Sequence, residues 1–435
     1  MVVVPYGAGL PGLASQLMGS VCGGPKSVAG FRRAALWPTP MVMKTFDKSF
    51  TQQEAIPADG IEAAVSVLSS GRLHRYNTGP GEVSEVARLE EEYAAYQGAA
   101  YCLAVTSGGQ AMQIALRAAG LKPGDAILAN AYTLAPVPGA IHACGGVPVF
   151  VEIGPDWLTD LDDLREKAAQ SGARFFMLSH MRGHIANMDA IMAICAEFGI
   201  TLIEDCAHTM GASWQGTRSG NFGSVACFST QTYKHMNSGE GGFLTTDDPA
   251  IAARAIILSG SYMLYERHGA APPPEVFETI RLATPNCSAR LDNLRAAILR
   301  AQLGQLDENC GRWNARYQAL EAGLRGVNGL RVVERPQHEA YVGSSFQFHA
   351  DVDDIPGFIS ACGRRGVELK WFGAADPVAF TSRYDSWQYF GDVPPLPKTL
   401  DALSTTVDLR VPLTFSVEDC ADIAAIIAEE AASAA

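Results

Sequence analysis

Short apolar segments alternate with helical segments between Gly81 and about Asp248, and this alternation constrains the fold more than any other feature of the sequence. The apolar segments have the length of buried strands, and stretches with helical periodicity lie between most of them. They span residues 101–106, 126–129, 147–151, 175–178, 201–203 and 225–228. Strands separated by helices pair in parallel, and ligands gather at their carboxyl ends. The sequence therefore predicts an α/β fold with a mainly parallel central sheet flanked by helices.

The length of 435 residues is too great for one ordinary core. A long helical region over 292–325 precedes a mixed pattern, which predicts a smaller α+β domain at the C-terminus. We expect an N-terminal extension over residues 1–42, a large α/β domain over 43–305 and a small α+β domain over 306–435. In the extension, the mildly apolar stretch 10–21 follows no basic residue and is too short to cross a bilayer. Neither a signal peptide nor a membrane span is expected there.

Composition argues against several classes of function. The net charge of −13 and the pI near 5.2 argue against nucleic acid and anionic membranes as main partners. The ten cysteines include no C-x-x-C pair, which is typical of a protein from a reducing compartment. No Cys/His pairs recur at the spacing of metal ligands. We therefore expect a cytoplasmic globular protein without a metal site.

An acidic pair, Glu204-Asp205, closes the apolar segment that begins at Thr201. This position places at least one carboxylate at the carboxyl edge of the sheet, where sites form. Asp205 is a candidate functional carboxylate, although an aspartate here can also cap a helix. His208 follows three residues later and can share a side of the turn with Asp205, in a structural or a catalytic role.

Two further segments combine polar residues with glycines. In the segment STQTYKHMNSGEGG (229–242), Lys234 stands before a glycine-rich turn. Lysines in loops are usually solvated, but a nucleophilic lysine beside a cofactor is the alternative. Between a strand and a helix lies Ser107-Gly108-Gly109-Gln110, where free amides and the positive end of the helix can bind a phosphate.

Taken together and in this order, these segments resemble the DegT/DnrJ/EryC1/StrS family of sugar aminotransferases, which are fold-type-I pyridoxal-phosphate enzymes. The resemblance extends from Gly71-Arg72-Leu73 to Val411-Pro412-Leu413. Four family motifs are matched: S-G-T-A-A at 107–111, V-H-x-x-G at 179–183, E-D-x-A-[QH]-x-x-G at 204–211 and S-x-x-x-x-K-x-x-x-x-G-E-G-G at 229–242. The last motif matches without a gap, and the combination is specific to the family.

The resemblance implies a role for each of these residues. Lys234 would carry pyridoxal 5'-phosphate as a Schiff base, the internal aldimine, and then act as general acid and base. Asp205 would pair with the pyridinium nitrogen, and His208 would lie near the 3'-oxygen of the cofactor. The phosphate would be held by Ser107, Gly108, Gly109 and Ser229.

The resemblance also implies the reaction and its partners. An amino acid donor, glutamate or glutamine, would convert the cofactor to its pyridoxamine form. The amine would then pass to the keto group of a sugar, nucleotide-sugar or cyclitol, with ping-pong kinetics. A homodimer with shared active sites is implied as well.

Three positions depart from the family pattern. The threonine of the phosphate turn is replaced by Gly109, which removes a hydroxyl. The aromatic residue that stacks on the pyridine ring is replaced by Leu134, so that either Leu134 contacts the ring or Tyr132 substitutes for the missing aromatic. The asparagine that reaches the partner subunit's phosphate has two candidates, Asn286 and, in the aligned position, Ser288.

Three other functions are weighed against transamination. Some relatives replace the lysine by histidine and act as sugar dehydratases, but here Lys234 holds the lysine position and His235 follows it. A non-catalytic cofactor-binding regulator would have no need of the retained lysine, aspartate and histidine. A nicotinamide oxidoreductase is not favoured, because the G-x-G-x-x-G turn after a first strand is missing.

Overall fold

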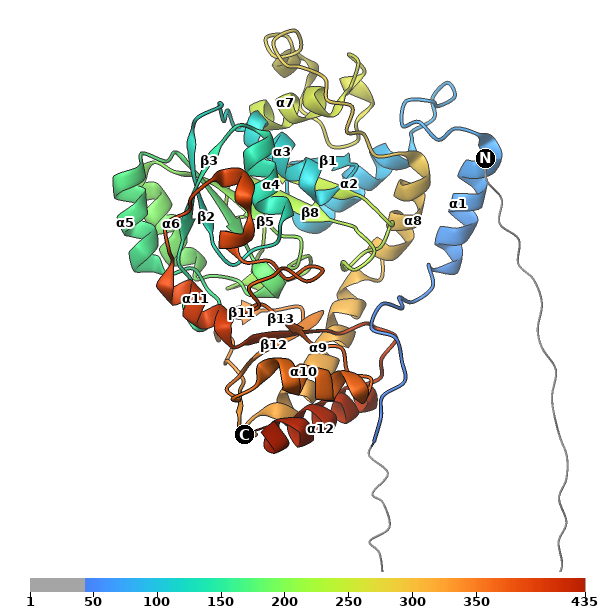
Figure 1. Cartoon of the computed structure of the whole chain (residues 1–435). Coiled ribbons are helices and arrows are strands. Elements are labelled where there is room, and N and C mark those ends of the chain that lie inside the picture. The colour runs from blue at the N-terminus through green and yellow to red at the C-terminus, as the bar shows by residue number, and fades with distance from the viewer. Residues whose placement is uncertain (1–43, 435) are drawn as a thin grey trace, which may run out of the picture. The chain divides into compact units, whose positions relative to one another are not determined.

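The computed structural model describes residues 44–434, so the extension predicted for residues 1–42 lies outside the described residues. A seven-stranded sheet forms the centre of the fold (Figure 1). Its strands are β1 (Tyr101–Val105), β2 (Ala126–Asn130), β3 (Val147–Val151), β4 (Phe175–Ser179), β5 (Thr201–Asp205), β8 (Val225–Ser229) and β9 (Gly242–Thr246). Their order across the sheet is β1-β9-β8-β5-β4-β2-β3.

Five neighbouring strands, from β8 to β3, pair in parallel, which confirms the predicted mainly parallel sheet. β9 differs from the expectation, since no strand was predicted there. It lies between β1 and β8 and is antiparallel to both. The physical reason is the connection, because no helix lies between β8 and β9 in the described structure. A parallel neighbour is usually reached through a crossover helix, whereas strands joined without one usually pair antiparallel.

Helices cover both faces of this sheet. The buried cluster on one face includes side chains from α2 (Glu85–Gln97), α5 (Leu161–Ser171), α6 (Met188–Phe198) and α8 (Asn293–Leu303). The cluster on the other face includes side chains from α3 (Gly108–Ala118), α4 (Pro136–Ala143) and α7 (Pro249–Ser259). Along β1, Cys102 and Ala104 belong to the first cluster, whereas Leu103 and Val105 belong to the second. Because side chains alternate along a strand, burial on both faces produces the continuous apolar runs seen in the sequence.

A second, four-stranded sheet is built from the C-terminal part of the chain. Its strands are β10 (Leu330–Arg331), β12 (Ser345–Ala350), β14 (Thr406–Arg410) and β13 (Lys370–Trp371), in that spatial order. Side chains from this sheet share a core with those of α9 (Leu306–Leu324), α10 (Ile355–Arg364) and α12 (Val417–Ala434). Phe46 and Phe50 pack into the same core, each with its ring centroid 4.9 Å from that of Phe415. The domain boundaries proposed from the sequence stay a prediction.

The other elements connect these layers. The predicted helical region 292–325 consists of two helices, α8 and α9, separated at Gly304. The remaining helices and strands are α1 (Ala58–Ser70), α11 (Pro397–Ser404), β6 (Ser213–Trp214), β7 (Thr217–Arg218), β11 (Glu339–Ala340) and the 3-10 helices η1 (Met181–Gly183), η2 (Tyr265–Arg267), η3 (Pro274–Phe277), η4 (Tyr384–Ser386) and η5 (Gln388–Phe390). Among residues 44–434, no helix has both the length and the apolar character needed to cross a membrane.

A buried ion pair fixes the segment before α2. Arg75 donates two hydrogen bonds, of 2.8 and 2.7 Å, to the carboxylate of Glu90, and both side chains are fully buried. His268 lies within 2.9 Å of Arg75 and within 2.7 Å of the Tyr76 hydroxyl. Burial alone would raise the pKa of Glu90, but the charges of Arg75 and then His268 outweigh it and lower the pKa to about 2. The cluster therefore joins three separate segments of the chain around one charged carboxylate.

We expect Glu90→Ala to lower the free energy of unfolding by about 3–5 kcal/mol, because it leaves the buried Arg75 without its partner. The control is Arg72→Ala, which breaks the exposed pair between Arg72 and Glu82 and should cost less than about 1 kcal/mol. Equilibrium urea denaturation measures both changes. Equal losses in the two variants would contradict the structural role of the buried pair.

Candidate active site

A cavity of about 340 Å³ lies at the carboxyl ends of the central strands. Residues that follow β1, β2, β4, β5 and β8 line one side, and residues near β12, β14 and the loop before η4 line the other. Among the lining residues are Ser107, Leu134, His208, Ser229, Lys234 and Arg410. The strand direction thus brings together polar side chains that are more than 100 positions apart in the sequence.

Lys234 reaches the cavity from the loop after β8. Its Nζ lies 2.7 Å from Nε2 of His208. Burial lowers the pKa of Lys234 from its ordinary value of 10.5 to about 7; the charges of Arg182 and Arg410 lower it further, whereas the carboxylate of Asp205 raises it. A substantial fraction of the amine is therefore neutral near pH 7, the form that acts as a nucleophile.

His208 lies on the turn that follows β5. Burial holds its pKa well below the usual range, and the charge of Lys234 acts in the same direction. The imidazole is therefore neutral at physiological pH, and its Nε2 can accept a hydrogen bond from the ammonium form of Lys234. This hydrogen bond fixes the position of the lysine amine.

The adjacent acidic residues Glu204 and Asp205 point to opposite faces of the sheet, as neighbours on a strand must. Asp205 ends β5 on the side of Lys234, and its side chain accepts hydrogen bonds from the Ser179 hydroxyl at 2.8 Å and from the backbone N–H of Ala207 at 3.1 Å. The residue is only 7% exposed. Asp205 is therefore the carboxylate of the pair whose charge raises the pKa of Lys234.

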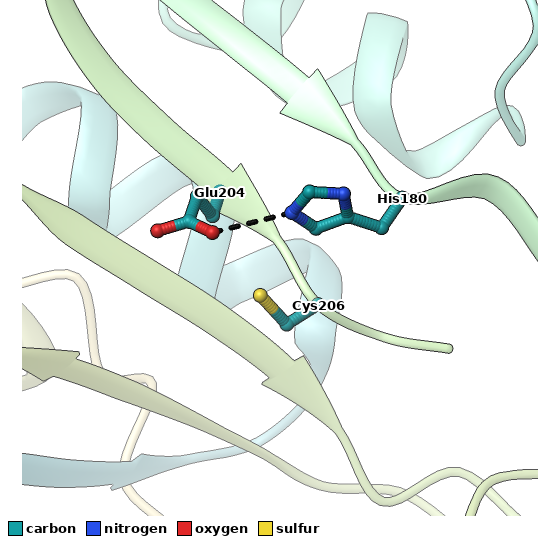
Figure 2. Close-up of side chains that lie close together, drawn as sticks. All are labelled: His180, Glu204 and Cys206. Carbon is teal, nitrogen blue, oxygen red and sulfur yellow. Dashed lines mark hydrogen bonds and ion pairs between the residues drawn. The ribbon is translucent and has the colours of Figure 1, made fainter. Parts of the chain in front are cut away.

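Glu204 belongs instead to a buried cluster with His180 and Cys206 (Figure 2). The three potential ligand atoms lie within 4.8 Å of one another, a spacing that could hold a metal ion. However, His180 already lies 3.2 Å from the carboxylate. Three backbone N–H groups also donate to it, at 2.7–3.0 Å: those of Gly220, Phe222 and Gly223. Because both carboxylate oxygens are engaged, the cluster serves to hold the loop after β7 against the sheet.

Ser107, Gly108 and Ser229, the residues predicted to hold a phosphate, lie together in the cavity at the start of α3, and this group is called the anion site below. The Ser107 hydroxyl accepts the N–H of Gln110 at 3.1 Å and so caps the helix. A Cβ atom on Gly108 would lie 2.8 Å from the Cβ of Ser229, whereas a Cβ on Gly109 would meet nothing closer than 3.8 Å. The absence of a side chain is therefore required at the first glycine only. The positive end of the helix and its free amides favour a bound anion.

Of the other residues singled out in the sequence, one lines this cavity and three do not. Leu134 lines it, but Tyr132 is buried with its ring 5.1 Å from that of Phe372. Asn286 is exposed on the loop before α8, where it accepts hydrogen bonds from the backbone N–H and the hydroxyl of Ser288, at 3.0 and 3.3 Å. The cavity lining thus includes Lys234, His208, Ser107, Gly108 and Ser229, but not Gly109, Tyr132, Asn286 or Ser288. Asp205 also lies outside the lining, but its charge acts on Lys234.

Two cavity residues, Arg182 and Arg410, were not identified from the sequence. Arg182 lies in η1 with a φ of 55°, in the left-handed region that costs a residue with a side chain about 1–3 kcal/mol. Arg410 ends β14, and its guanidinium lies 3.6 Å from the ring centroid of Tyr233. Arg182 falls inside the 179–183 motif, which was a usable signal, but nothing in the sequence near Arg410 indicated that β14 ends at the cavity.

The sequence profile of the DegT/DnrJ/EryC1/StrS aminotransferase family matches residues 56–428. The chain belongs to this family. One relative is the dTDP-3-amino-3,4,6-trideoxy-alpha-D-glucose transaminase of Streptomyces venezuelae, with 35% identity over 284 residues, 64% of this chain and 68% of the relative. A second is the L-glutamine:2-deoxy-scyllo-inosose aminotransferase of Streptomyces kanamyceticus, with 32% identity over 306 residues, 69% of each chain.

Solved structures of this family have the same fold. The crystal structure of DesV from S. venezuelae superimposes with a TM-score of 0.73 at 28% identity and covers 86% of this chain and 94% of DesV. The fold-type-I architecture predicted from the resemblance is confirmed. The family and the named relatives together identify the chain as an aminotransferase.

In cofactor-free protein, we expect the reactivity of the Lys234 amine toward acetic anhydride to reach half of its maximum near pH 7, because burial lowers its pKa to about 7. Competitive labelling followed by mass spectrometry of the Lys234 peptide measures this profile. Asp205→Asn should move the midpoint to lower pH, because the carboxylate raises the pKa. Arg410→Gln should move it to higher pH, because the guanidinium lowers it. A midpoint near 10.5 in the unaltered protein would contradict the effect of burial.

Proposed function

We propose that this chain is a pyridoxal-phosphate-dependent aminotransferase that acts with ping-pong kinetics. The amino group passes from an amino acid donor, glutamate or glutamine, to the keto group of a sugar, nucleotide-sugar or cyclitol. The observation that carries the proposal is the amine of Lys234, which lies 2.7 Å from His208 in a cavity that also contains an anion site. Bound pyridoxal phosphate supplies an electron sink for the negative charge that develops on the substrate carbon.

The lining residues of the cavity, with Asp205 just outside the lining, fit the chemical groups of this cofactor. Ser107, Gly108 and Ser229 supply hydroxyl groups and a helix start for a phosphate. The carboxylate of Asp205 suits a protonated ring nitrogen, because opposite charges stabilise each other where water is excluded. The amine of Lys234 suits an aldehyde. A phosphate, a ring nitrogen and an aldehyde on one small molecule thus each have a partner of matching chemistry.

Lys234 would also move the proton during each half-reaction. Its pKa of about 7 allows the amine to take up a proton and to release it near neutral pH, which is the requirement for general acid and base catalysis. The neutral His208 would keep the amine in place without adding a competing charge. Asp205 would hold the ring nitrogen in its protonated form throughout.

The relatives support this class of substrates. The S. venezuelae relative is named for a dTDP-linked amino sugar, and the S. kanamyceticus relative for L-glutamine and an inosose. The dehydratase alternative gains no support from His235. That residue does not line the cavity, and its Nε2 lies 3.0 Å from the Ser344 hydroxyl, while its ring packs edge-on against Trp313.

We expect purified protein loaded with pyridoxal phosphate to show an absorbance band near the visible edge that borohydride abolishes. Lys234→Ala should lack this band, because the amine that binds the aldehyde is gone. Lys370→Ala is the matched control, since Lys370 is also partly buried but does not line the cavity. Addition of glutamate or glutamine should bleach the band in the unaltered protein. A reducible link that survives Lys234→Ala would overturn the assignment of the nucleophile.

The same proposal includes a homodimer. Ile61, Val65 and Leu68 are 51–56% exposed and lie along one face of α1 at helical spacing. Tyr262 and Leu282 are also exposed, at 61% and 86%, on loops that follow α7 and η3. Apolar side chains that gather on one helix face in this way are typical of an interface. A second copy of the chain, which the resemblance to this family implies, is the partner that we propose for this face.

We expect Val65→Asp to shift the protein from dimer to monomer, because it places a charge in the apolar stripe of α1. Light scattering after size-exclusion chromatography measures the molar mass. The control is Val417→Asp at the start of α12, where a valine of similar exposure (47%, against 54% for Val65) is isolated from the stripe. A monomeric unaltered protein at micromolar concentration would contradict the homodimer.

A further inference from the structure

We propose that Arg182 and Arg410 form a carboxylate-binding pair, and that the keto acceptor of this enzyme is a small compound that carries a carboxylate group. This inference rests on the proposed function, since it names the acceptor class for the same cavity. It concerns the part of the cavity that the anion site at the start of α3 does not account for. The two arginines come from different sheets, so only the folded chain brings them together.

The guanidinium of Arg182 is buried but incompletely paired. The residue is 8% exposed and lines the cavity. Its Nη2 forms an ion pair with Oδ2 of Asp408 at 2.9 Å, although the geometry is not that of a hydrogen bond and both atoms stay without one. Its Nε has no hydrogen-bond partner among the described residues. A buried guanidinium with unused donors is costly unless an acceptor satisfies them. A ligand carboxylate, with two oxygens, supplies acceptors of the right charge and shape.

A buried polar chain holds Arg182 in this position. His184 lies 2.8 Å from Oε1 of Gln347, and Nε2 of Gln347 donates to Oδ1 of Asp408 at 2.7 Å. Asp408 in turn faces Arg182, as described above. The left-handed backbone of Arg182 is a further constraint, because residues with side chains adopt it rarely and it recurs at binding sites. The arginine is thus held in place before any ligand arrives.

Arg410 supplies the second cation. Its guanidinium is stacked on the ring of Tyr233, which orients the plane of the donors. Arg182 and Arg410 line the same cavity. Burial lowers the pKa of Arg410, and repulsion from the charge of Arg182 acts in the same direction. Among the lining residues in the described part of the chain, Glu240 is the acidic one, and it is exposed. An anion between the two arginines would relieve their repulsion.

The size of the cavity limits the acceptor. Its 340 Å³ lies near the lower end of the range of about 300–1,000 Å³ for ligand sites, and the cofactor would take part of this space. In a ping-pong reaction the donor and the acceptor use the same space in turn. A donor amino acid brings a carboxylate in the first half-reaction, so an acceptor with its own carboxylate can use the same pair of arginines in the second.

Direct binding to the cofactor-loaded protein tests the pair without any turnover. The probes are benzoate and benzamide, which have similar shape but differ in charge, measured by isothermal titration calorimetry. We expect benzoate to bind at least tenfold more tightly than benzamide. Arg182→Gln and Arg410→Gln should each remove this preference, and Arg182→Lys should retain part of it with the same backbone strain. The control Arg331→Gln, which changes an exposed arginine of β10, should leave the preference unchanged.

Half-reactions then test the acceptor. Protein converted to its amine form by glutamate or glutamine is mixed with 3-oxocyclohexanecarboxylate or with the corresponding amide, and the return of the visible band is followed. We expect the acid to reach half-saturation at a concentration at least tenfold lower than the amide. Arg182→Gln should abolish this difference. Thermal unfolding midpoints within a few degrees of the unaltered protein establish that the variants are folded.

The outcomes separate this inference from the proposed function. If neither donor bleaches the band, the proposed function fails, and the preference for benzoate over benzamide still decides whether the arginines bind a carboxylate. If the donor reacts but acid and amide acceptors saturate equally, the acceptor class is overturned and the proposed function stands. Equal binding of benzoate and benzamide overturns the pair itself. The acceptor class is also overturned if Arg182→Gln slows the donor half-reaction but leaves the acceptor half-reaction unchanged.

Discussion

The parallel pairing of β5 with β4 and β8 is the constraint on which the site depends. It places Ser179 opposite Asp205 and ends β8 at Ser229, all at one edge of the sheet. The alternation along β5 then divides its two carboxylates, with Glu204 in the buried structural cluster and Asp205 near the lysine. A slip of one residue would exchange these roles, because each side chain would move to the opposite face.

Burial in the cavity determines the chemistry of the site. Lys234 and His208 lie in contact, and burial lowers the pKa of both, which favours their neutral forms. The carboxylate of Asp205 opposes this effect at Lys234 and keeps the pKa near 7. An exposed lysine in the same loop would be protonated and unreactive at this pH. The low-dielectric surroundings therefore favour the neutral amine that the proposed roles of nucleophile and proton carrier require.

The second sheet supplies charged side chains to the cavity as well as part of its wall. Asp408 and Arg410 stand two positions apart on β14. Arg410 lines the cavity, and Asp408 pairs with Arg182, which follows β4 of the central sheet. Hydrogen bonds from Asp408 to Gln347 and from Gln347 to His184 also link β14 and β12 to the segment after β4. Interactions between the sheets thus set the charge of the cavity, and this charge is the basis for the proposed selection of a carboxylated acceptor.

Local sequence determined most of the central sheet, the family and the positions of Lys234, Asp205 and His208, because strand length, helical periodicity and motif spacing are properties of neighbouring residues. Only the tertiary structure decided that β9 inserts antiparallel, that Tyr132 packs against Phe372 outside the cavity lining, and that Arg182 pairs with Asp408 and lines the same cavity as Arg410. These contacts join residues more than 200 positions apart, or depend on which strands become neighbours. The physical reason is that strands pair and side chains become buried only when distant segments pack together. Strand pairing then sets the orientation of the side chains, and burial sets the pKa of the titratable groups.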